Sequence, residues 1–172
     1  MSQERTGVAT FKSNPITLIG PEIKVGDQAP DFHVNKNLLE EVTLATYANK
    51  VKLISVVPSL DTGVCDTQTR RFNEEAANLG ENVVILTISA DLPFAQARWC
   101  GAAGVDKVIT LSDYKTKSFG TSYGVLIQEF QLDMRAIFVI DANDTVQYVE
   151  YLSEMTEHPN YEKAIEAVKA LV

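Results

Sequence analysis

The stretch that decides the fold runs from Val51 to Leu79 and reads VKLISVVPSLDTGVCDTQTRRFNEEAANL. It opens with an apolar, largely β-branched run, Val51–Val57, which is long enough to form a buried strand. Pro58 ends the strand because proline has no N–H to donate to a ladder of backbone hydrogen bonds. Asp61 or Thr62 can then cap a helix, which apolar residues at roughly helical spacing continue. The stretch therefore predicts a strand followed directly by a helix.

Cys65 falls in the first turn of this expected helix, just beyond the carboxyl end of the strand. Open α/β sheets bind ligands at that place, and the free N–H groups and positive dipole end of a helix N-terminus favour a thiolate. We therefore interpret Cys65 as a nucleophile. Thr62 lies three residues earlier, at N-cap to N3 spacing, so its hydroxyl and the sulfur can face one small site. The alternative is that Thr62 is only a cap and Cys65 a small buried hydrophobe.

The rest of the chain alternates strand-like and helix-like segments. We expect an N-terminal hairpin within residues 8–25, a short strand and turn at 38–47, strands at 81–89 and 108–111, a helix at 90–104, a short glycine-interrupted helix or turn at 115–123, a hairpin at 134–151, and a final helix from His158-Pro159. This order predicts an α/β protein of thioredoxin-like fold, with a central mixed β-sheet flanked by helices and an N-terminal β-hairpin. At 172 residues we expect a single domain, 1–172.

The composition is acidic, with 15 Lys and Arg against 23 Asp and Glu and a formal net charge of −8. Nucleic-acid binding has little support, because phosphate contacts need clustered basic residues. No segment resembles a membrane span, and the N-terminus has no apolar signal core, so we expect no membrane partner and a cytoplasmic location. The two cysteines of a chain in a reducing compartment are more often catalytic or redox-sensing than structural.

Cys100 is the second thiol, on the helix expected at 90–104. The chain has no Cys-x-x-Cys, so the dithiol exchange motif of thioredoxins is absent. A structural zinc site needs four ligands, which two lone cysteines do not supply. His33 and His158 lie far from either cysteine in sequence, and we interpret both as surface or loop residues. For Cys100 itself, packing against the sheet and a redox role stay equally open.

Arg135 stands immediately before Ala136–Ile140, an apolar run that we expect to be a central strand. Burying a guanidinium without an anionic partner is costly, so a charge at this place needs a carboxylate or a thiolate nearby. Its five donors in a fixed fork also suit a developing oxyanion. Arg70 and Arg71 are rival candidates, but they lie more than a helical turn beyond Cys65 and are expected on the solvated side.

Four motifs together resemble the peroxiredoxins: PSLDTGVC at Pro58–Cys65, VGDQAPDF before it, Cys100 within LPFAQARWCGAAG, and Arg135 within MRAIFVID. The chain is most similar to the bacterial thiol peroxidase subfamily, of the atypical two-cysteine type. The resemblance covers nearly the whole chain. The chain has no C-terminal cysteine, unlike typical two-cysteine relatives, whose resolving cysteine comes from the partner subunit.

The resemblance implies that Cys65 is the peroxidatic cysteine and Cys100 the resolving cysteine of the same subunit. It implies that Pro58, Thr62 and Arg135 bind the peroxide. It further implies a thioredoxin-like fold, a homodimer, thioredoxin as reductant, and hydrogen peroxide and alkyl hydroperoxides as substrates, with no metal, flavin or haem cofactor.

Two other classes of function remain at this point. A general disulfide oxidoreductase would exchange thiols with protein substrates, and a redox-sensing or binding module would have thiols that do not turn over. A further expectation concerns motion. A disulfide needs Cα atoms within about 7 Å of each other, and Cys65 and Cys100 sit on successive helices, so we expect a local rearrangement when they pair.

Overall fold

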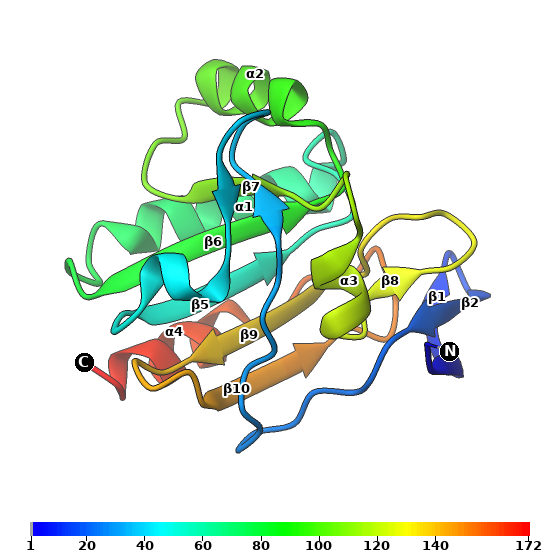
Figure 1. Ribbon diagram of the computed structural model, residues 1–172. Helices are drawn as coiled ribbons and strands as arrows, with labels where there is room; N and C mark the ends of the chain where they lie inside the picture. The colour runs from blue at the N-terminus through cyan, green and yellow to red at the C-terminus, as the bar shows by residue number, and fades with distance from the viewer. Residues whose placement is uncertain (1) are drawn as a thin grey trace.

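The computed structural model describes residues 2–172, and a seven-stranded mixed sheet forms its centre (Figure 1). In spatial order the strands are β10 (Val146–Tyr151), β9 (Ala136–Ile140), β5 (Val51–Val56), β6 (Val83–Ser89), β7 (Ile109–Ser112), β3 (Val34–Asn35) and β4 (Glu41–Val42). Strands β5, β6 and β7 run parallel, whereas β9 pairs antiparallel with β5. Every residue of β5 and β9 is buried, as expected for strands covered on both faces.

Helices cover both faces of this sheet. They are α1 (Gly63–Ala76), α2 (Pro93–Ala103), α3 (Ser118–Ser122) and α4 (Tyr161–Lys169), with a 3₁₀ turn, η1, at Leu44–Tyr47. On one face Phe72 of α1 and Ile165 of α4 pack against strand residues such as Leu53. On the other face Phe119 of α3 packs against Ile54 of the same strand. Figure 1 shows α3 in front of the sheet and α1 and α4 behind it. No helix within residues 2–172 is long and apolar enough to span a lipid bilayer.

A second, three-stranded sheet contains the N-terminal hairpin, in the order β1 (Glu4–Phe11), β2 (Asn14–Ile19) and β8 (Leu126–Ile127). Lys12 and Ser13 form the hairpin turn with positive φ. Their backbone N–H groups donate to the Glu154 carboxylate, at 2.8 and 3.2 Å. A hydrogen bond from the Thr10 hydroxyl is the largest cause that lowers the pKa of Glu154, and the two backbone bonds lower it further, to about 2. The hairpin is thus tied to the segment that follows β10.

The structure confirms the predicted thioredoxin-like α/β fold with its mixed sheet and N-terminal hairpin. Several boundaries differ from the expectation by one to three residues or more. The hairpin begins at Glu4 rather than near residue 8, α2 begins at Pro93, and α4 begins at Tyr161 after the cap Asn160, whose side chain accepts the Lys163 N–H. Strand β8 was not expected, because a strand of two residues has no measurable periodicity.

Candidate active site

The junction between β5 and α1 places Cys65 in the interior. Thr62 has an extended backbone and is the N-cap of α1, so Cys65 is the third residue of the helix, as the spacing predicted. Its side chain has no exposed surface and packs with Val57, Leu60 and the partly buried ring of Trp99. The sulfur therefore lies at a helix N-terminus within a small apolar cluster, where its polar contacts are few.

Arg135 supplies the polar contact of that sulfur. Its side chain is 2% exposed, and Nη2 donates to the Cys65 Sγ at 3.2 Å. Nη1 donates to the Gln68 Oε1 at 2.9 Å, and Nε and Nη2 donate to the Met155 carbonyl at 3.1 and 3.0 Å. Gln68 in turn donates from Nε2 to the Ser55 Oγ at 2.7 Å. The guanidinium is thus held in place by neutral acceptors.

Among the described residues, the charge of Arg135 has no carboxylate to balance it. Within residues 2–172 no carboxylate forms an ion pair with Arg135, although its side chain is almost fully buried. A buried cation without an anion is costly, and within residues 2–172 the Cys65 thiol is the one ionisable side chain to which Arg135 donates a hydrogen bond. Ionised, the thiol provides the negative charge that the site lacks.

A cavity of about 230 Å³ opens beside this pair. It is lined by Phe11, Pro58, Thr62, Gly63, Val64, Arg135, Met155 and Thr156. The hairpin contributes Phe11 to the lining, and the segment after β10 contributes Met155. The hydrogen bonds of Glu154 to the hairpin turn hold these two segments together. The Thr62 hydroxyl donates to the Ser59 carbonyl at 3.0 Å, so its oxygen can still accept a hydrogen bond. The pocket therefore offers apolar walls, the guanidinium of Arg135 and the hydroxyls of Thr62 and Thr156.

Asp91 fixes the loop that carries Pro58. Its Oδ1 accepts the Ser59 hydroxyl at 2.7 Å, and its Oδ2 accepts the Leu60 N–H and the Ser89 hydroxyl, each at 2.8 Å. Leu92 rather than Asp91 occupies the N-cap of α2, and Pro93 is the first residue of the helix. Asp91 thus connects the loop before α1 with the start of α2.

Cys100 lies on α2 in a different environment. Both cysteines are free thiols, and Cys100 is partly buried, with its Sγ 3.7 Å from the Thr110 Oγ1. Burial raises the pKa of the Cys100 thiol above its usual value, whereas the hydrogen bond with Thr110 opposes this rise. Cys100 packs against the cluster between the sheet and α1, α2 and α4, while Cys65 belongs to a separate small cluster. The two sulfurs therefore have separate hydrogen-bond partners, Arg135 for Cys65 and Thr110 for Cys100, although Trp99 packs against both clusters.

Four of the residues singled out in the sequence meet at one site: Cys65, Arg135, Thr62 and Pro58. Cys100 lies on the neighbouring helix rather than in the pocket. The rival cations contact other groups, since Arg70 pairs with Asp66 and Arg71 pairs with Glu75 and Glu162. His33 and His158 are exposed, as expected.

The contacts of Gln68, Met155 and Asp91 were not predicted. Gln68 has a recognisable sign in the sequence: a polar residue three positions after Cys65, on the helix face that turns toward the strand. The Met155 contact has no recognisable sign in the sequence, because the backbone carbonyl accepts the hydrogen bonds of Arg135 and any side chain could stand at this position.

Comparison with known proteins places the chain in a family. The family model described as Redoxin matches residues 24–165. The thiol peroxidase of Bacillus subtilis (strain 168) is 66% identical over 163 residues, covering 95% of this chain and 97% of that protein. The thiol peroxidase of Listeria innocua serovar 6a is 59% identical over 160 residues, covering 93% of this chain and 96% of that protein.

Solved structures agree with this placement. A peroxiredoxin-like protein from Aquifex aeolicus superposes with a TM-score of 0.89 at 41% identity, with 99% of each chain covered. A thiol peroxidase from Chromobacterium violaceum superposes with a TM-score of 0.83 over 94% of this chain and 95% of that chain; at 22% identity it shows the shared fold alone. The family model and the full-length similarity confirm the resemblance seen in the motifs: the chain belongs to the Redoxin family and, within it, to the thiol peroxidases, enzymes of the peroxiredoxin type.

Proposed function

We propose that this enzyme reduces hydrogen peroxide and alkyl hydroperoxides through Cys65 and returns to the dithiol form through a disulfide with Cys100. One observation carries the proposal: the buried guanidinium of Arg135 donates to the Cys65 sulfur at 3.2 Å and also lines the adjacent pocket. A cation shared by a thiol and a cavity can hold the thiolate and the second reactant at once.

The first step is a displacement at oxygen. The Cys65 thiolate attacks the terminal oxygen of the hydroperoxide, a sulfur–oxygen bond forms, and the oxygen–oxygen bond breaks. Sulfur is oxidised to the sulfenic acid, and the departing alkoxide or hydroxide takes a proton and leaves as alcohol or water. Arg135 and the N-terminus of α1 stabilise the negative charge that develops on the departing oxygen, and Thr62 accepts the hydroperoxide O–H.

The second step joins the two cysteines. The Cys100 sulfur attacks the sulfenic sulfur of Cys65, the disulfide forms, and the hydroxyl group leaves as water with the proton of the Cys100 thiol. An external dithiol then reduces the disulfide, and we propose thioredoxin for this reductant.

The walls of the pocket favour organic substrates beside hydrogen peroxide. Phe11, Val64 and Met155 present hydrocarbon or thioether surface on which an alkyl group can lie while its hydroperoxide end faces Arg135. We also propose a homodimeric, cytoplasmic enzyme that protects against peroxide stress.

Steady-state turnover tests this function. Wild type, Cys65→Ser and Cys100→Ser are compared for consumption of hydrogen peroxide and of cumene hydroperoxide, with and without a thioredoxin system. We expect turnover only in wild type with the thioredoxin system, and one equivalent consumed by Cys100→Ser. Turnover by Cys65→Ser at the wild-type rate would overturn the proposal, and thiol exchange with protein substrates but no peroxide consumption would favour a general disulfide oxidoreductase.

A further inference from the structure

Three side chains outside the pocket join the helices that carry the two cysteines. Asp66 of α1 accepts the Trp99 Nε1–H of α2 through Oδ1 at 3.0 Å. Its other oxygen, Oδ2, accepts the Arg70 Nε–H at 2.8 Å. We call Asp66, Arg70 and Trp99 the helix bridge. One carboxylate thus connects a side chain of its own helix with a side chain of the next.

Arg70 completes the bridge in two ways. Its guanidinium lies over the Trp99 ring, 5.6 Å from the ring centroid, which is a cation–π contact. Its Nη1 also donates to the Ala103 carbonyl at 3.1 Å, at the end of α2. Each contact adds little free energy on its own, because the Arg70 side chain is 46% exposed. Together they form a network that requires α1 and α2 to keep one relative position.

The bridge stands directly beside both cysteines in the chain. Asp66 follows Cys65, and Trp99 precedes Cys100. The Trp99 ring also packs against the small cluster that contains Cys65. The bridge therefore holds the backbone at both cysteines in the conformation in which the Cys65 sulfur faces Arg135.

Little else fills the space between the start of α1 and Trp99. An open depression of about 300 Å³ lies there, lined by Leu60, Asp61, Thr62, Gly63, Asp66 and Trp99. Hydrogen bonds and ring contacts, rather than a packed core, tie the first turn of α1 to α2 on this side. Such a segment can open locally at low cost once those ties separate.

We propose that Asp66, Arg70 and Trp99 are positioning residues that stabilise the dithiol conformation and must separate before the Cys65–Cys100 disulfide can form. The inference rests on the proposed function, in which these two cysteines pair. The Cys65 sulfur must leave Arg135, and the first turn of α1, which carries Asp66, moves with it. Because the bridge exists only in the dithiol form, its free energy opposes the disulfide.

A redox titration against glutathione measures this opposition without any peroxide. One glutathione disulfide oxidises the dithiol to the Cys65–Cys100 disulfide and yields two reduced glutathione molecules, so the equilibrium constant compares the two protein forms directly. We expect Asp66→Ala and Arg70→Ala to raise this constant about threefold to tenfold, the range of one or two partly exposed hydrogen bonds to charged groups. Intact mass after alkylation of free thiols gives the disulfide fraction.

The same helix offers matched controls. Glu74→Ala removes an exposed carboxylate that has no hydrogen bond or ion pair from its side chain within residues 2–172. Arg71→Ala removes an arginine that pairs with Glu75 and with Glu162 of α4, away from α2. Trp99→Phe removes the Nε1–H donor and part of the ring surface but keeps an aromatic ring beside Cys65, so it serves where Asp66→Ala folds poorly. We expect wild-type constants in both controls and a raised constant in Trp99→Phe.

The melting temperature of each variant distinguishes a positioning role from a general loss of stability. Loss of stability shared by the dithiol and disulfide forms lowers the melting temperature but leaves the equilibrium constant unchanged. Constants equal to those of the controls would overturn the inference, and lowered constants would show that the bridge stabilises the disulfide form. If wild type does not react with peroxide yet the titration follows the expectation, the proposed function fails and the inference about the helix bridge stands. If neither oxidant links Cys65 to Cys100 in wild type, both fail.

Discussion

Arg135 is a buried charge whose hydrogen bonds, the one to the Cys65 sulfur apart, go to neutral oxygens. In the proposed reaction it stabilises the negative charge of that sulfur and of the oxygen that departs from the hydroperoxide. Replacing it by lysine keeps the charge but loses the fork that contacts Gln68, Met155 and Cys65 at the same time.

We predict that Arg135→Ala lowers the thiolate fraction of Cys65 at neutral pH and slows sulfenic acid formation by about 10²–10³-fold, the usual loss when one preorganised donor is removed. Arg135→Lys should recover only part of this loss. Ultraviolet absorbance of the thiolate during a pH titration and single-turnover rates after rapid mixing measure the two effects. Unchanged values for both in Arg135→Ala would return Arg70 or Arg71 to consideration.

The position of a single functional residue can be predicted from the sequence where a reactive or charged residue directly adjoins an apolar strand. Cys65 stands just after an apolar strand, and Arg135 stands just before another. Both were predicted to lie at one site, and the structure brings them into hydrogen-bond contact. The acceptors of Arg135 were not predictable to the same degree, because Met155 acts through its carbonyl. Thr62 was correctly placed as the N-cap, yet its hydroxyl contacts the Ser59 carbonyl instead of capping the helix.

Between elements, Asp91 is the principal link in the loop that leads into α1. Its two carboxylate oxygens accept hydrogen bonds from Ser59, Leu60 and Ser89. We predict that Asp91→Ala loosens the wall of the pocket at Pro58 and slows sulfenic acid formation about tenfold, because two buried donors lose their acceptor. Single-turnover rates measure this change. Asp61→Ala, an exposed carboxylate in the same loop, is the control, and equal rates in the two variants would contradict the assignment.

The N-terminal sheet meets α3 where backbones approach closely. Gly124 has φ +68°, and a Cβ there would collide with the Pro21 carbonyl oxygen. We predict that Gly124→Ala destabilises the protein by about 3 kcal/mol or more, from backbone strain together with displacement of Pro21. Gly80 has φ +84° but open space around it, so Gly80→Ala should cost only about 1 kcal/mol. Urea unfolding measures both, and equal losses would show that the close approach contributes nothing.

The long strands could be predicted from the sequence, whereas the two-residue strands could not. The continuous apolar runs of β5, β6 and β9 predicted buried strands because both faces of those strands are covered. Strands β3 and β8 have two residues each, too few for any periodic pattern. The helix predicted over residues 90–104 begins only at Pro93, and Asp91 before it accepts hydrogen bonds from a loop about thirty residues earlier in the chain, which the sequence does not reveal.

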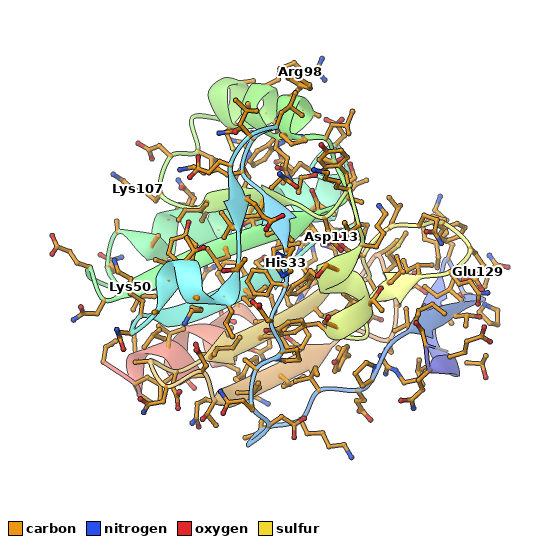
Figure 2. All side chains as sticks on the ribbon, in the orientation of Figure 1. His33, Lys50, Arg98, Lys107, Asp113 and Glu129 are labelled. Carbon is orange, nitrogen blue, oxygen red and sulfur yellow. The ribbon has the colours of Figure 1, made fainter. Side chains whose placement is uncertain are left out.

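The stability of the whole molecule should depend on a buried acid pair on the side of the sheet covered by α3. Asp113 and Asp133 are 1% and 0% exposed. Figure 2 shows Asp113 close to the ribbon of α3, and its carboxylate accepts the N–H groups of Phe119 and Gly120. Neither oxygen of Asp133 has a hydrogen-bond partner within residues 2–172. Burial raises the pKa of both carboxyls, and the charge of Asp113 raises that of Asp133 further, whereas Lys117 opposes both shifts.

The sign of the pH effect follows from these shifts. Because the folded-state pKa values lie above the unfolded ones, the folded protein holds more protons, and this pair destabilises it progressively as pH rises from about 4 through the folded-state values. We predict that Asp133→Asn removes most of this dependence and is more stable than wild type at pH 8, by on the order of 2 kcal/mol. Urea unfolding of both proteins from pH 4.5 to 8 tests this. Parallel stability curves would contradict it.

The proposed function depends most on one pair of roles, with Cys65 as the thiol that peroxide oxidises and Cys100 as the thiol that forms the disulfide with it. Peptide mass spectrometry after one equivalent of hydrogen peroxide, with a dimedone trap for sulfenic acid, reads both roles directly. We predict a Cys65–Cys100 disulfide in wild type, a trapped sulfenic acid at Cys65 in Cys100→Ser, and no oxidised cysteine in Cys65→Ser. Sulfenic acid at Cys100 in Cys65→Ser, formed as fast as the wild-type disulfide, would contradict the assignment.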